Sequence, residues 1–293
     1  MEDTTVLQFR KLNESHGLTP EAVRLFRRTI YDYYAENGRN LPWRNTDNPY
    51  HILVSEVMLQ QTQVERVLDK YEQFIAAFPD FSSLAAAPLK GVLSEWQGLG
   101  YNRRAVALNK IAYRVVSEFN GTLPDSCEVL MTLPGIGRAT ASAIAAFAFH
   151  KPAVFLETNI RSVFIHLFFN EKDTIQDAEI LPLVEVTLDN DDPREWYYAL
   201  MDYGVMLKRE HRNPTRRSAH YKRQSPFHGS NREMRGMILK MLVKESDIAE
   251  YEIAQKLKKS PEVISANLQQ LEKEGFIEKK GKRFRISQTP VDR

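Results

Sequence analysis

The chain has 293 residues, with 40 Lys and Arg against 38 Asp and Glu and a formal net charge of +2, so the overall charge does not by itself indicate nucleic acid. That length allows two domains and a small third. The sequence contains no apolar run near the roughly 18 residues that a membrane span needs, and its N-terminus lacks an apolar signal-peptide core. Both observations argue against a membrane or secreted protein. The single cysteine, Cys127, excludes internal disulfides and fits a reducing compartment, so we expect a cytoplasmic, nucleoid-associated protein.

Apolar residues spaced three and four apart dominate from Glu21 to Leu271, and few segments alternate as strands do. The sequence therefore predicts a mostly α protein of short helices separated by Gly and Pro. In chain order the helices are expected at Pro20–Tyr34, Tyr50–Phe78, Phe81–Ala87, Leu89–Gln97, Asn102–Phe119, Ser126–Met131, Gly137–Phe149, Asn159–Phe169, Asp177–Leu188 and Pro193–Leu207.

The last third of the chain has a different pattern. Asn213–Asn231 is polar and basic, and we expect an extended connector there. Helices are expected at Arg232–Val243, Tyr251–Leu257 and Pro261–Lys273, followed by an alternating apolar and basic hairpin at Phe276–Ile286. This order resembles a winged helix-turn-helix domain, whose third helix usually enters the DNA major groove. A protein-interaction module on the same scaffold is the alternative.

Basic residues concentrate in two places. Lys208–Arg223 holds seven Lys and Arg against one acid, Glu210, and a second cluster lies at Lys279–Arg285. Such clusters are usually only solvated, but two of them beside motifs with a DNA-binding logic favour phosphate contacts.

The run Ser55–Val64 reads Ser-Glu-Val-Met-Leu-Gln-Gln-Thr-Gln-Val, and we expect it within a helix. Burial disfavours a charged carboxylate, so Glu56 among apolar neighbours would hold its proton, as a general acid must. Clustered glutamines need hydrogen-bond partners that a plain core does not supply. The alternative is a surface-facing Glu56 on a solvated polar stripe.

A second motif is Leu133–Arg138, Leu-Pro-Gly-Ile-Gly-Arg, followed by a helix of small residues. Gly135 and Gly137 at a helix N-terminus let backbone N–H groups face an anion, and the helix dipole adds favourable charge. An ordinary tight turn between helices is the alternative.

Together these motifs resemble the adenine DNA glycosylases of the MutY family, within the helix-hairpin-helix glycosylase superfamily, over about Ile30–Met206. The resemblance implies a two-lobed, mostly α fold. In that family the Glu matched by Glu56 protonates the purine, and the Gln matched by Gln61 wedges into the DNA stack. The hairpin grips a DNA phosphate without reading sequence and can hold a monovalent cation.

Phe155–Ile160 resembles the family segment with the catalytic aspartate, which stabilises the sugar cation as the base departs. The matching residue is Glu157, one methylene longer, and Asn159 matches a supporting Asn. The alternative role for Glu157 is that of a helix N-cap, and both could hold together.

Trp96–Asn102 resembles the family loop that enters the minor groove, where Tyr101 matches a Tyr near the base opposite the excised one. A turn anchored in the core is the alternative. Leu41–Arg44 also matches, which makes Trp43 and Arg44 pocket or structural residues.

The residue after the hairpin separates two reaction types. Related bifunctional glycosylases such as endonuclease III carry a Lys there, which forms a Schiff base with the sugar. The matching residue is Ala139, whose methyl group cannot attack the sugar. We therefore expect hydrolysis by water with little or no strand cleavage.

Two further departures from the family concern its cofactor and its C-terminal domain. Most members hold an iron–sulfur cluster through four cysteines, whereas the matching stretch Lys208–Gln224 has none, so no cluster is expected. The basic run and Tyr221 would stabilise that lobe or grip phosphates instead. The domain that recognises 8-oxoguanine is absent, and the winged helix stands in its place, which leaves the excised base and its partner open.

The expected function is that of a monofunctional DNA glycosylase of base excision repair, which flips adenine opposite 8-oxoguanine or guanine and hydrolyses its N-glycosidic bond. The alternatives are excision of uracil, thymine or hypoxanthine, or a non-catalytic DNA-binding or regulatory protein. The expected catalytic residues are Glu56, Glu157 and Asn159. The expected DNA contacts are Trp43, Arg44, Gln60, Gln61, Thr62, Leu99, Tyr101, Asn102, Gly135, Gly137, Arg138, Ala139, Lys208, Arg216, Arg217 and Tyr221.

The expected domains are a cluster-less helical lobe (1–40 and 154–212), a six-helix barrel lobe with the helix-hairpin-helix (41–153), a basic connector (213–230) and a winged helix domain (231–288). The expected partner is double-stranded DNA with a mismatch or lesion, bound by a monomer away from any membrane.

Overall fold

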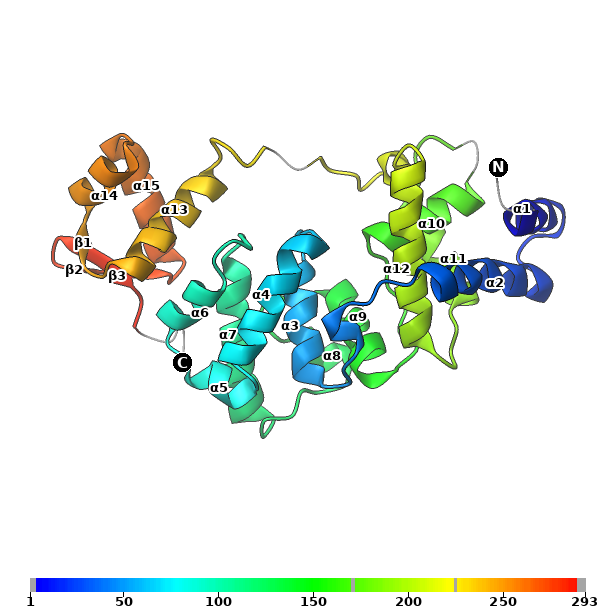
Figure 1. Cartoon of the computed structure of the whole chain (residues 1–293), viewed down its shortest axis with the longest axis horizontal. Helices are drawn as coiled ribbons and strands as arrows, with labels where there is room; N and C mark the ends of the chain where they lie inside the picture. The colour runs from blue at the N-terminus through cyan, green and yellow to red at the C-terminus, as the bar shows by residue number, and fades with distance from the viewer. Residues whose placement is uncertain (1–3, 170–171, 224–225, 289–293) are drawn as a thin grey trace. The chain divides into compact units, whose positions relative to one another are not determined.

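The computed structural model describes residues 4–169, 172–223 and 226–288, which are mostly helical, as the sequence predicts (Figure 1). The helices up to the hairpin motif are α1 (Thr4–His16), α2 (Pro20–Asn37), the short 3₁₀ helix η1 (Pro42–Arg44), α3 (Pro49–Leu59), α4 (Val64–Ala77), α5 (Phe81–Ala86), α6 (Leu89–Glu95), α7 (Arg103–Glu118) and α8 (Cys127–Leu130). Those that follow are α9 (Arg138–Phe149), α10 (Thr158–Phe168), α11 (Asp177–Thr187), α12 (Pro193–Glu210) and the 3₁₀ helix η2 (Pro214–Arg217). Among the described residues, every helix falls short of the length or apolar character that crossing a bilayer requires.

The chain divides into two compact units. The first comprises Met1–Asp47 and Gly137–Arg223, and the second comprises Asn48–Ile136 and Gln224–Arg293. Helix α9 therefore belongs to the first unit, whereas the sequence interpretation grouped it with the barrel lobe. The winged helix domain shares the second unit with α3 to α8.

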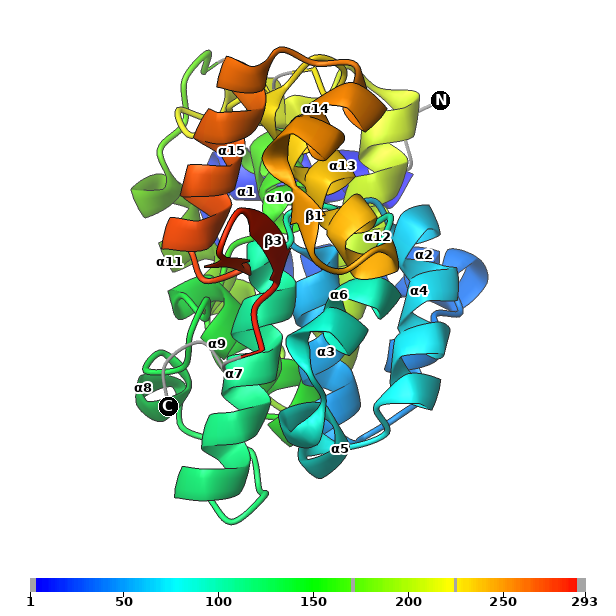
Figure 2. The ribbon, with the colours of Figure 1, turned by 90° about the vertical axis from the view of Figure 1, so that its left-hand side faces the viewer.

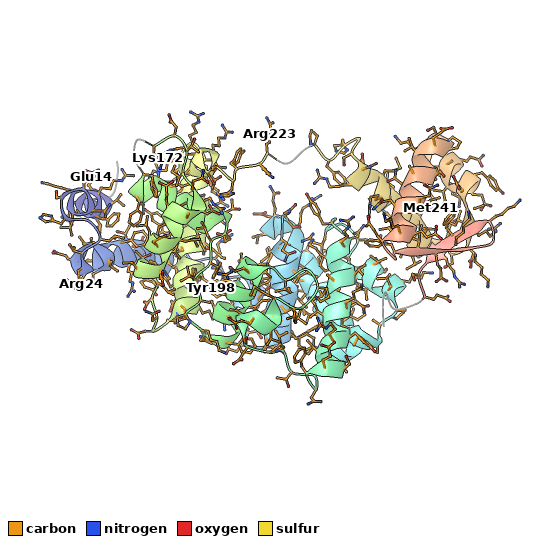
Figure 3. The ribbon with its side chains drawn as sticks, turned by 180° about the vertical axis from the view of Figure 1, so that it is seen from behind. Glu14, Arg24, Lys172, Tyr198, Arg223 and Met241 are labelled. Atoms are coloured by element: carbon orange, nitrogen blue, oxygen red, sulfur yellow. The ribbon has the colours of Figure 1, made fainter. Side chains whose placement is uncertain are left out.

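Aromatic side chains from distant parts of the chain form the core of the first unit. The ring of Phe26 lies 5.5 Å from Phe9, 5.5 Å from Phe164 and 5.7 Å from Trp196, measured between ring centroids. Tyr198, labelled in Figure 3, stacks on Phe147 at 4.6 Å. These contacts join α1, α2, α9, α10 and α12 around one apolar centre.

The winged helix domain has the expected order of elements. Its parts are α13 (Asn231–Lys244), β1 (Ile248–Ala249), α14 (Glu250–Leu257), α15 (Pro261–Lys273), β2 (Ile277–Lys280) and β3 (Arg283–Ile286). The strands form an antiparallel sheet of order β1-β3-β2, in which Lys279 pairs with Phe284 and Ile248 pairs with the same residue from the other side. Figure 2 shows these elements grouped around α13. The predicted hairpin is confirmed, and β1 adds a third strand.

Two expectations about the helices are wrong. The sequence did not predict α1, whose stability comes from burial of Val6 and Phe9 at 4% and 1% exposure rather than from a long apolar stripe. The single helix expected at Tyr50–Phe78 is interrupted, because α3 ends at Leu59 and α4 begins at Val64. The interruption falls within the glutamine run and has a specific structural cause, given below.

Candidate functional site

Helix α3 of the second unit carries the expected general acid. Asn48 accepts a hydrogen bond from the Tyr50 backbone N–H at 2.9 Å, and Pro49 sits in the first turn, so the helix begins with a side-chain cap and a preset φ. Most side chains of α3 are buried, for example Ile52 at 1% exposure, whereas Glu56 is only partly buried. A carboxylate is thus held on a helix that is otherwise packed into the core.

The glutamine run lies in a turn after α3 and not within a helix. Gln60 follows the last helical residue, and Gln61 adopts a left-handed φ of 54°. The Thr62 N–H donates to the Leu59 carbonyl at 3.2 Å, and the Gln61 side chain is exposed. A left-handed conformation is uncommon for a residue other than glycine, so contacts around the turn must impose it.

One buried guanidinium imposes this turn. Arg104, on α7 and 8% exposed, donates through Nη1 to the carbonyls of Val57, Met58 and Gln60 at 3.0, 2.7 and 2.6 Å. Its Nη2 donates to the Thr62 hydroxyl at 2.9 Å. These bonds satisfy the last carbonyls of α3, for which a helix has no internal partners. Burial lowers the pKa of Arg104 to about 10, so the group remains charged at neutral pH.

The same guanidinium anchors the loop Trp96–Asn102. The indole N–H of Trp96 donates to the Gly100 carbonyl at 3.0 Å, and Arg104 Nη2 donates to the same carbonyl at 3.1 Å. The guanidinium carbon lies 5.4 Å from the Trp96 ring and 5.5 Å from the Tyr101 ring. Gly100 and Tyr101 have φ values of 72° and 48°, so the loop reverses sharply just before α7. Arg104 therefore ties the glutamine turn to this loop.

Sequence reasoning missed Arg104. The available signal was indirect: a helix that ends in polar residues needs donors for its last carbonyls, and an arginine within a largely apolar helix can supply them. The structure brings Gln60, Thr62 and Tyr101 together around this residue. Leu99 is only 2% exposed, so its side chain belongs to the core. Asn102 precedes the first residue of α7.

Backbone conformation and packing both favour glycine in the hairpin motif Leu133–Arg138. Gly135 has a φ of 76°, and a Cβ there would lie 3.2 Å from the Ala107 side chain, so both conformation and space favour glycine. The Gly137 carbonyl accepts a hydrogen bond from the Ala141 N–H at 2.9 Å, which starts α9. An exposed helix N-terminus suits an anion, and the phosphate contact stays a prediction. The exposed residues there are Gly137, Arg138 and Ala139.

Glu157 lies in the first unit as the N-cap residue of α10. Its Oε1 accepts hydrogen bonds from the backbone N–H groups of Asn159 and Ile160 at 2.6 and 2.7 Å, and its Oε2 accepts one from the Asn159 side-chain amide at 3.2 Å. The capping role considered for Glu157 is confirmed. Its catalytic role stays a prediction. Burial raises the pKa of Glu157, although the Ile160 N–H and the Lys208 charge act in the opposite direction.

Lys208, on α12, completes this network. Its Nζ donates to Asn159 Oδ1 at 2.7 Å, so the Asn159 amide links the ammonium group to the Glu157 carboxylate. Burial lowers the pKa of Lys208, whereas the Glu157 charge raises it. The structure thus brings together Glu157, Asn159 and Lys208, and it directs the Lys208 ammonium group toward Asn159. The expected phosphate contact of Lys208 stays a prediction.

Gly204 allows α12 to approach α10 at this network. A Cβ at position 204 would lie 2.2 Å from the Asn159 carbonyl oxygen. Gly204→Ala should therefore lower the free energy of unfolding by about 3 kcal/mol, because the helices must separate. Gly91→Ala is the matched control, since Gly91 is also helical and its Cβ would meet its nearest atom at 3.8 Å. Denaturant unfolding of both variants checks this, and equal stability of the two would contradict the packing argument.

Trp43 and Arg44 have structural contacts. Trp43 is 4% exposed, and Arg44 donates through Nη1 and Nη2 to the two carboxylate oxygens of Asp202 at 2.8 and 2.7 Å. Arg39 Nε donates to the same carboxylate at 2.7 Å, and the Arg44 guanidinium carbon lies 4.5 Å from the Tyr198 ring. Burial acts to raise the pKa of Asp202, but the hydrogen bonds from Arg44 and Arg39 outweigh it and hold the pKa below its usual value.

Hydrogen bonds from Arg217 hold the segment that follows α12. Its Nε donates to the Lys172 carbonyl at 2.8 Å, and its Nη2 donates to the Phe169 carbonyl. The Arg217 carbonyl in turn accepts from the Ile175 N–H at 2.8 Å. Arg217 therefore stabilises this lobe, which is one of the two roles expected for the basic run.

Arg216 and Tyr221 are more accessible. Arg216 is exposed, and Tyr221 is 41% exposed, so both side chains can reach solvent. Their phosphate contacts stay predictions. Gln224, the last residue of the stretch that matches the cluster-binding segment, lies outside the described residues.

Two regions of the chain match models of known protein families. Residues 54–183 match the model of the HhH-GPD superfamily of base excision DNA repair proteins, and residues 232–278 match a winged helix-turn-helix DNA-binding model. The chain is 37% identical over 188 residues to an adenine DNA glycosylase of Buchnera aphidicola subsp. Baizongia pistaciae. The matched region covers 62% of this chain and 53% of that protein. Over 182 residues the chain is 35% identical to an adenine DNA glycosylase of Mycobacterium tuberculosis, which covers 60% and 59%. The chain therefore matches only a little over half the length of these relatives.

Solved structures show the same fold. A thermostable thymine-DNA glycosylase is similar at a TM-score of 0.56 and 25% identity, over 63% of this chain and 86% of that one. A trapped endonuclease III–DNA covalent intermediate is similar at a TM-score of 0.54 and 22% identity, over 72% and 91%, which supports the fold alone.

Proposed function

We infer that this chain, which carries a domain of the HhH-GPD superfamily of base excision DNA repair proteins at residues 54–183, is a DNA glycosylase. The base we propose is adenine opposite 8-oxoguanine or guanine, because the curated relatives that match are adenine DNA glycosylases. The base would leave the DNA stack before its N-glycosidic bond is cut, since that bond is inaccessible within a duplex.

The observation that carries the proposal is the partly buried Glu56 on α3, followed just beyond the helix end by the exposed, left-handed Gln61. A carboxyl group at this position can act as a general acid and donate its proton to a departing base. After base departure the same carboxylate can accept a proton from the attacking water. Gln61 at the turn would fill the gap that the flipped base leaves.

Glu157 would stabilise the sugar cation as the bond breaks. Its carboxylate is fixed by two backbone N–H groups and the Asn159 amide, so it would be oriented before the charge develops. The Asn159 amide is itself fixed by Lys208. The Glu157 side chain is one methylene longer than Asp, but hydrogen bonds to both carboxylate oxygens keep it in a fixed position.

The proposed reaction is hydrolysis without strand cleavage. Ala139 stands where a lyase would carry its Schiff-base lysine, and an alkyl side chain offers no amine. Borohydride trapping on an abasic duplex should yield no covalent protein–DNA complex, and an efficient trapped complex would contradict this part of the proposal.

We further propose that the protein works as a monomer without an iron–sulfur cluster, on double-stranded DNA in the nucleoid. A four-cysteine cluster does not fit this chain, which has one cysteine. Arg217, which lies in the segment where the cluster cysteines would be, donates hydrogen bonds to the carbonyls of Lys172 and Phe169 instead.

A single-turnover assay of base release tests the proposed substrate. The duplexes carry adenine opposite 8-oxoguanine, guanine or cytosine, or carry uracil, thymine or hypoxanthine. The fastest release is expected for adenine opposite 8-oxoguanine or guanine. Release of another base instead would keep the scaffold and change the substrate, whereas no release from any duplex would leave a DNA-binding protein without this activity.

Lys208→Met should shift the pH dependence of the reaction. Glu157 must be ionised to stabilise a cation, so the rate falls as pH drops through its pKa. The Lys208 charge lowers that pKa, and its removal should raise it, so the acid limb of the pH–rate profile moves to higher pH. At neutral pH the rate should fall by about tenfold, because Asn159 loses its partner. Lys208→Arg should restore part of the rate, and an unchanged profile in Lys208→Met would contradict the role.

A further inference from the structure

The winged helix domain is fixed to α7 through a nearly buried carboxylate. Glu274, which follows α15, accepts hydrogen bonds from Arg103 Nε at 2.9 Å and Arg235 Nη1 at 2.9 Å. Its side chain is 13% exposed, and these hydrogen bonds lower the pKa of Glu274. Lys90 Nζ adds a hydrogen bond to the Ser246 hydroxyl at 2.9 Å. Arg235 lies on α13 within the domain and orients the Glu274 carboxylate, whereas Arg103 on α7 and Lys90 on α6 supply the contacts across the boundary.

Docking in this way brings a second guanidinium to Tyr101. Arg232, on α13, donates through Nη1 to the Tyr101 hydroxyl, and its guanidinium carbon lies 5.2 Å from the Tyr101 ring. Arg104 lies 5.5 Å from the same ring. Tyr101 in the loop Trp96–Asn102 therefore contacts one guanidinium from α7 and one from the winged helix domain.

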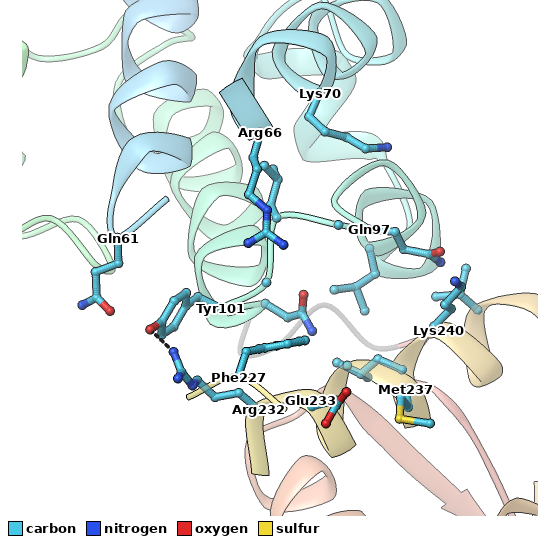
Figure 4. A pocket seen from close by; sticks show the side chains of 18 of the residues that line it. Gln61, Arg66, Lys70, Gln97, Tyr101, Phe227, Arg232, Glu233, Met237 and Lys240 are labelled. Carbon is cyan, nitrogen blue, oxygen red and sulfur yellow. Dashed lines mark hydrogen bonds between the residues drawn. The ribbon is translucent and has the colours of Figure 1, made fainter. Parts of the chain in front are cut away.

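A cavity of about 820 Å³ opens between α13 and the loop Trp96–Asn102, and Figure 4 shows its lining. The carboxylate of Glu233 accepts a hydrogen bond from the Gly229 N–H at 2.7 Å. Phe227 is 50% exposed and lines the same space. The cationic residues among the described lining are Arg66, Lys70, Arg232 and Lys240.

This lining suits one class of ligand. Cations in excess of carboxylates attract phosphates, and an exposed aromatic ring offers a surface on which a base can stack. Gln61 and Tyr101 line the cavity too, which connects it to the glutamine turn. An apolar peptide would gain little from four cations, so a nucleic acid strand fits better than a protein segment.

We propose that this cavity binds the DNA strand opposite the excised base. Arg66, Arg232 and Lys240 hold its phosphates, and Phe227 stacks on one of its bases. The inference rests on the proposed function, because that function puts Gln61, which lines this cavity, at the gap that the flipped base leaves. The winged helix domain thereby contributes to reading the base that pairs with the target.

Equilibrium binding of the full-length protein tests the site. The probe is a duplex with a tetrahydrofuran abasic analogue opposite guanine, followed by fluorescence anisotropy. Arg232→Ala and, separately, Lys240→Ala should each raise Kd by about tenfold and lower the salt dependence of log Kd by about one. Arg28→Ala is the control, because Arg28 is exposed in α2 and pairs with Asp32 on the same helix at 3.3 Å. An unchanged Kd in both cavity variants would overturn the proposal. A lower Kd in both would also overturn it, because it would show that these side chains oppose DNA binding.

Photocrosslinking identifies the strand. One duplex carries 5-iodouracil next to the abasic analogue, and a second carries it in the other strand, next to the guanine opposite the analogue. Each duplex is irradiated with the protein, and the labelled peptide is identified by mass spectrometry. The peptide containing Phe227 should be labelled from the strand opposite the abasic analogue, and labelling only from the other strand would overturn the proposal. Neither readout needs base release, so an absence of glycosylase activity with this crosslink intact would reject the proposed function and keep the binding site.

Discussion

Glu56→Gln should lower the single-turnover rate of base release by about 10³-fold, which is within the usual contribution of a general acid. Glutamine keeps the size of the side chain and its place on α3, but its amide has no acidic proton to transfer to the departing base. DNA binding should be retained, because the change adds no bulk and removes no cation. The rate is measured as free base released from a duplex in excess of enzyme, and Kd is measured by anisotropy on the same duplex.

Glu72→Gln is the matched control for this variant. Glu72 lies on α4 of the same unit and is exposed, so its replacement should leave both the rate and Kd unchanged. A Glu56→Gln protein that released base at the wild-type rate would contradict the assignment of the general acid.

Arg104→Met should lower the free energy of unfolding by about 4 kcal/mol. Methionine fills much of the same space without donors, so the carbonyls of Val57, Met58 and Gln60 lose their shared partner. An unsatisfied buried polar group costs about 1–3 kcal/mol, and such costs do not add fully. Base release should slow as well, because the Gln61 turn and the Tyr101 loop lose their common anchor.

Arg114→Met separates this effect from loss of an ordinary arginine. Arg114 is on the same helix and pairs with Glu118, one turn away, whose side chain is 45% exposed; it also donates to the exposed Thr132 carbonyl at 2.7 Å. Its loss should cost about 1 kcal/mol or less, since exposed ion pairs contribute little. Denaturant unfolding of the two variants side by side is the measurement, and a similar loss for both would contradict the clamp.

Helix starts could be predicted because their signals are local. Thr19 before Pro20, Asp192 before Pro193 and Ser260 before Pro261 each precede a helix that begins at the proline. Pairing a cap with a proline at the first position fixes a helix start within a few residues, without information from the rest of the chain. In the winged helix domain this signal marks the start of α15, and the other elements were predicted from apolar spacing and alternation.

The break after α3 could not be predicted in this way. Gln60 and Gln61 are tolerable helix formers, so the local pattern favours continuation through them. The helix ends because Arg104, distant in sequence, offers its carbonyls a better set of donors. Lys208 shows the same limit, since its bond to Asn159 depends on the close approach of two helices at Gly204.

The most direct test of the central claim, protonation of a flipped base by Glu56, is to replace the target adenine by 7-deazaadenine. This analogue has a C–H group where adenine has N7, so it fits the same pocket but cannot take a proton at that position. We predict that the wild-type protein binds both duplexes with similar Kd and releases 7-deazaadenine at least about 10²-fold more slowly than adenine. Release of both bases at the same rate would contradict the account.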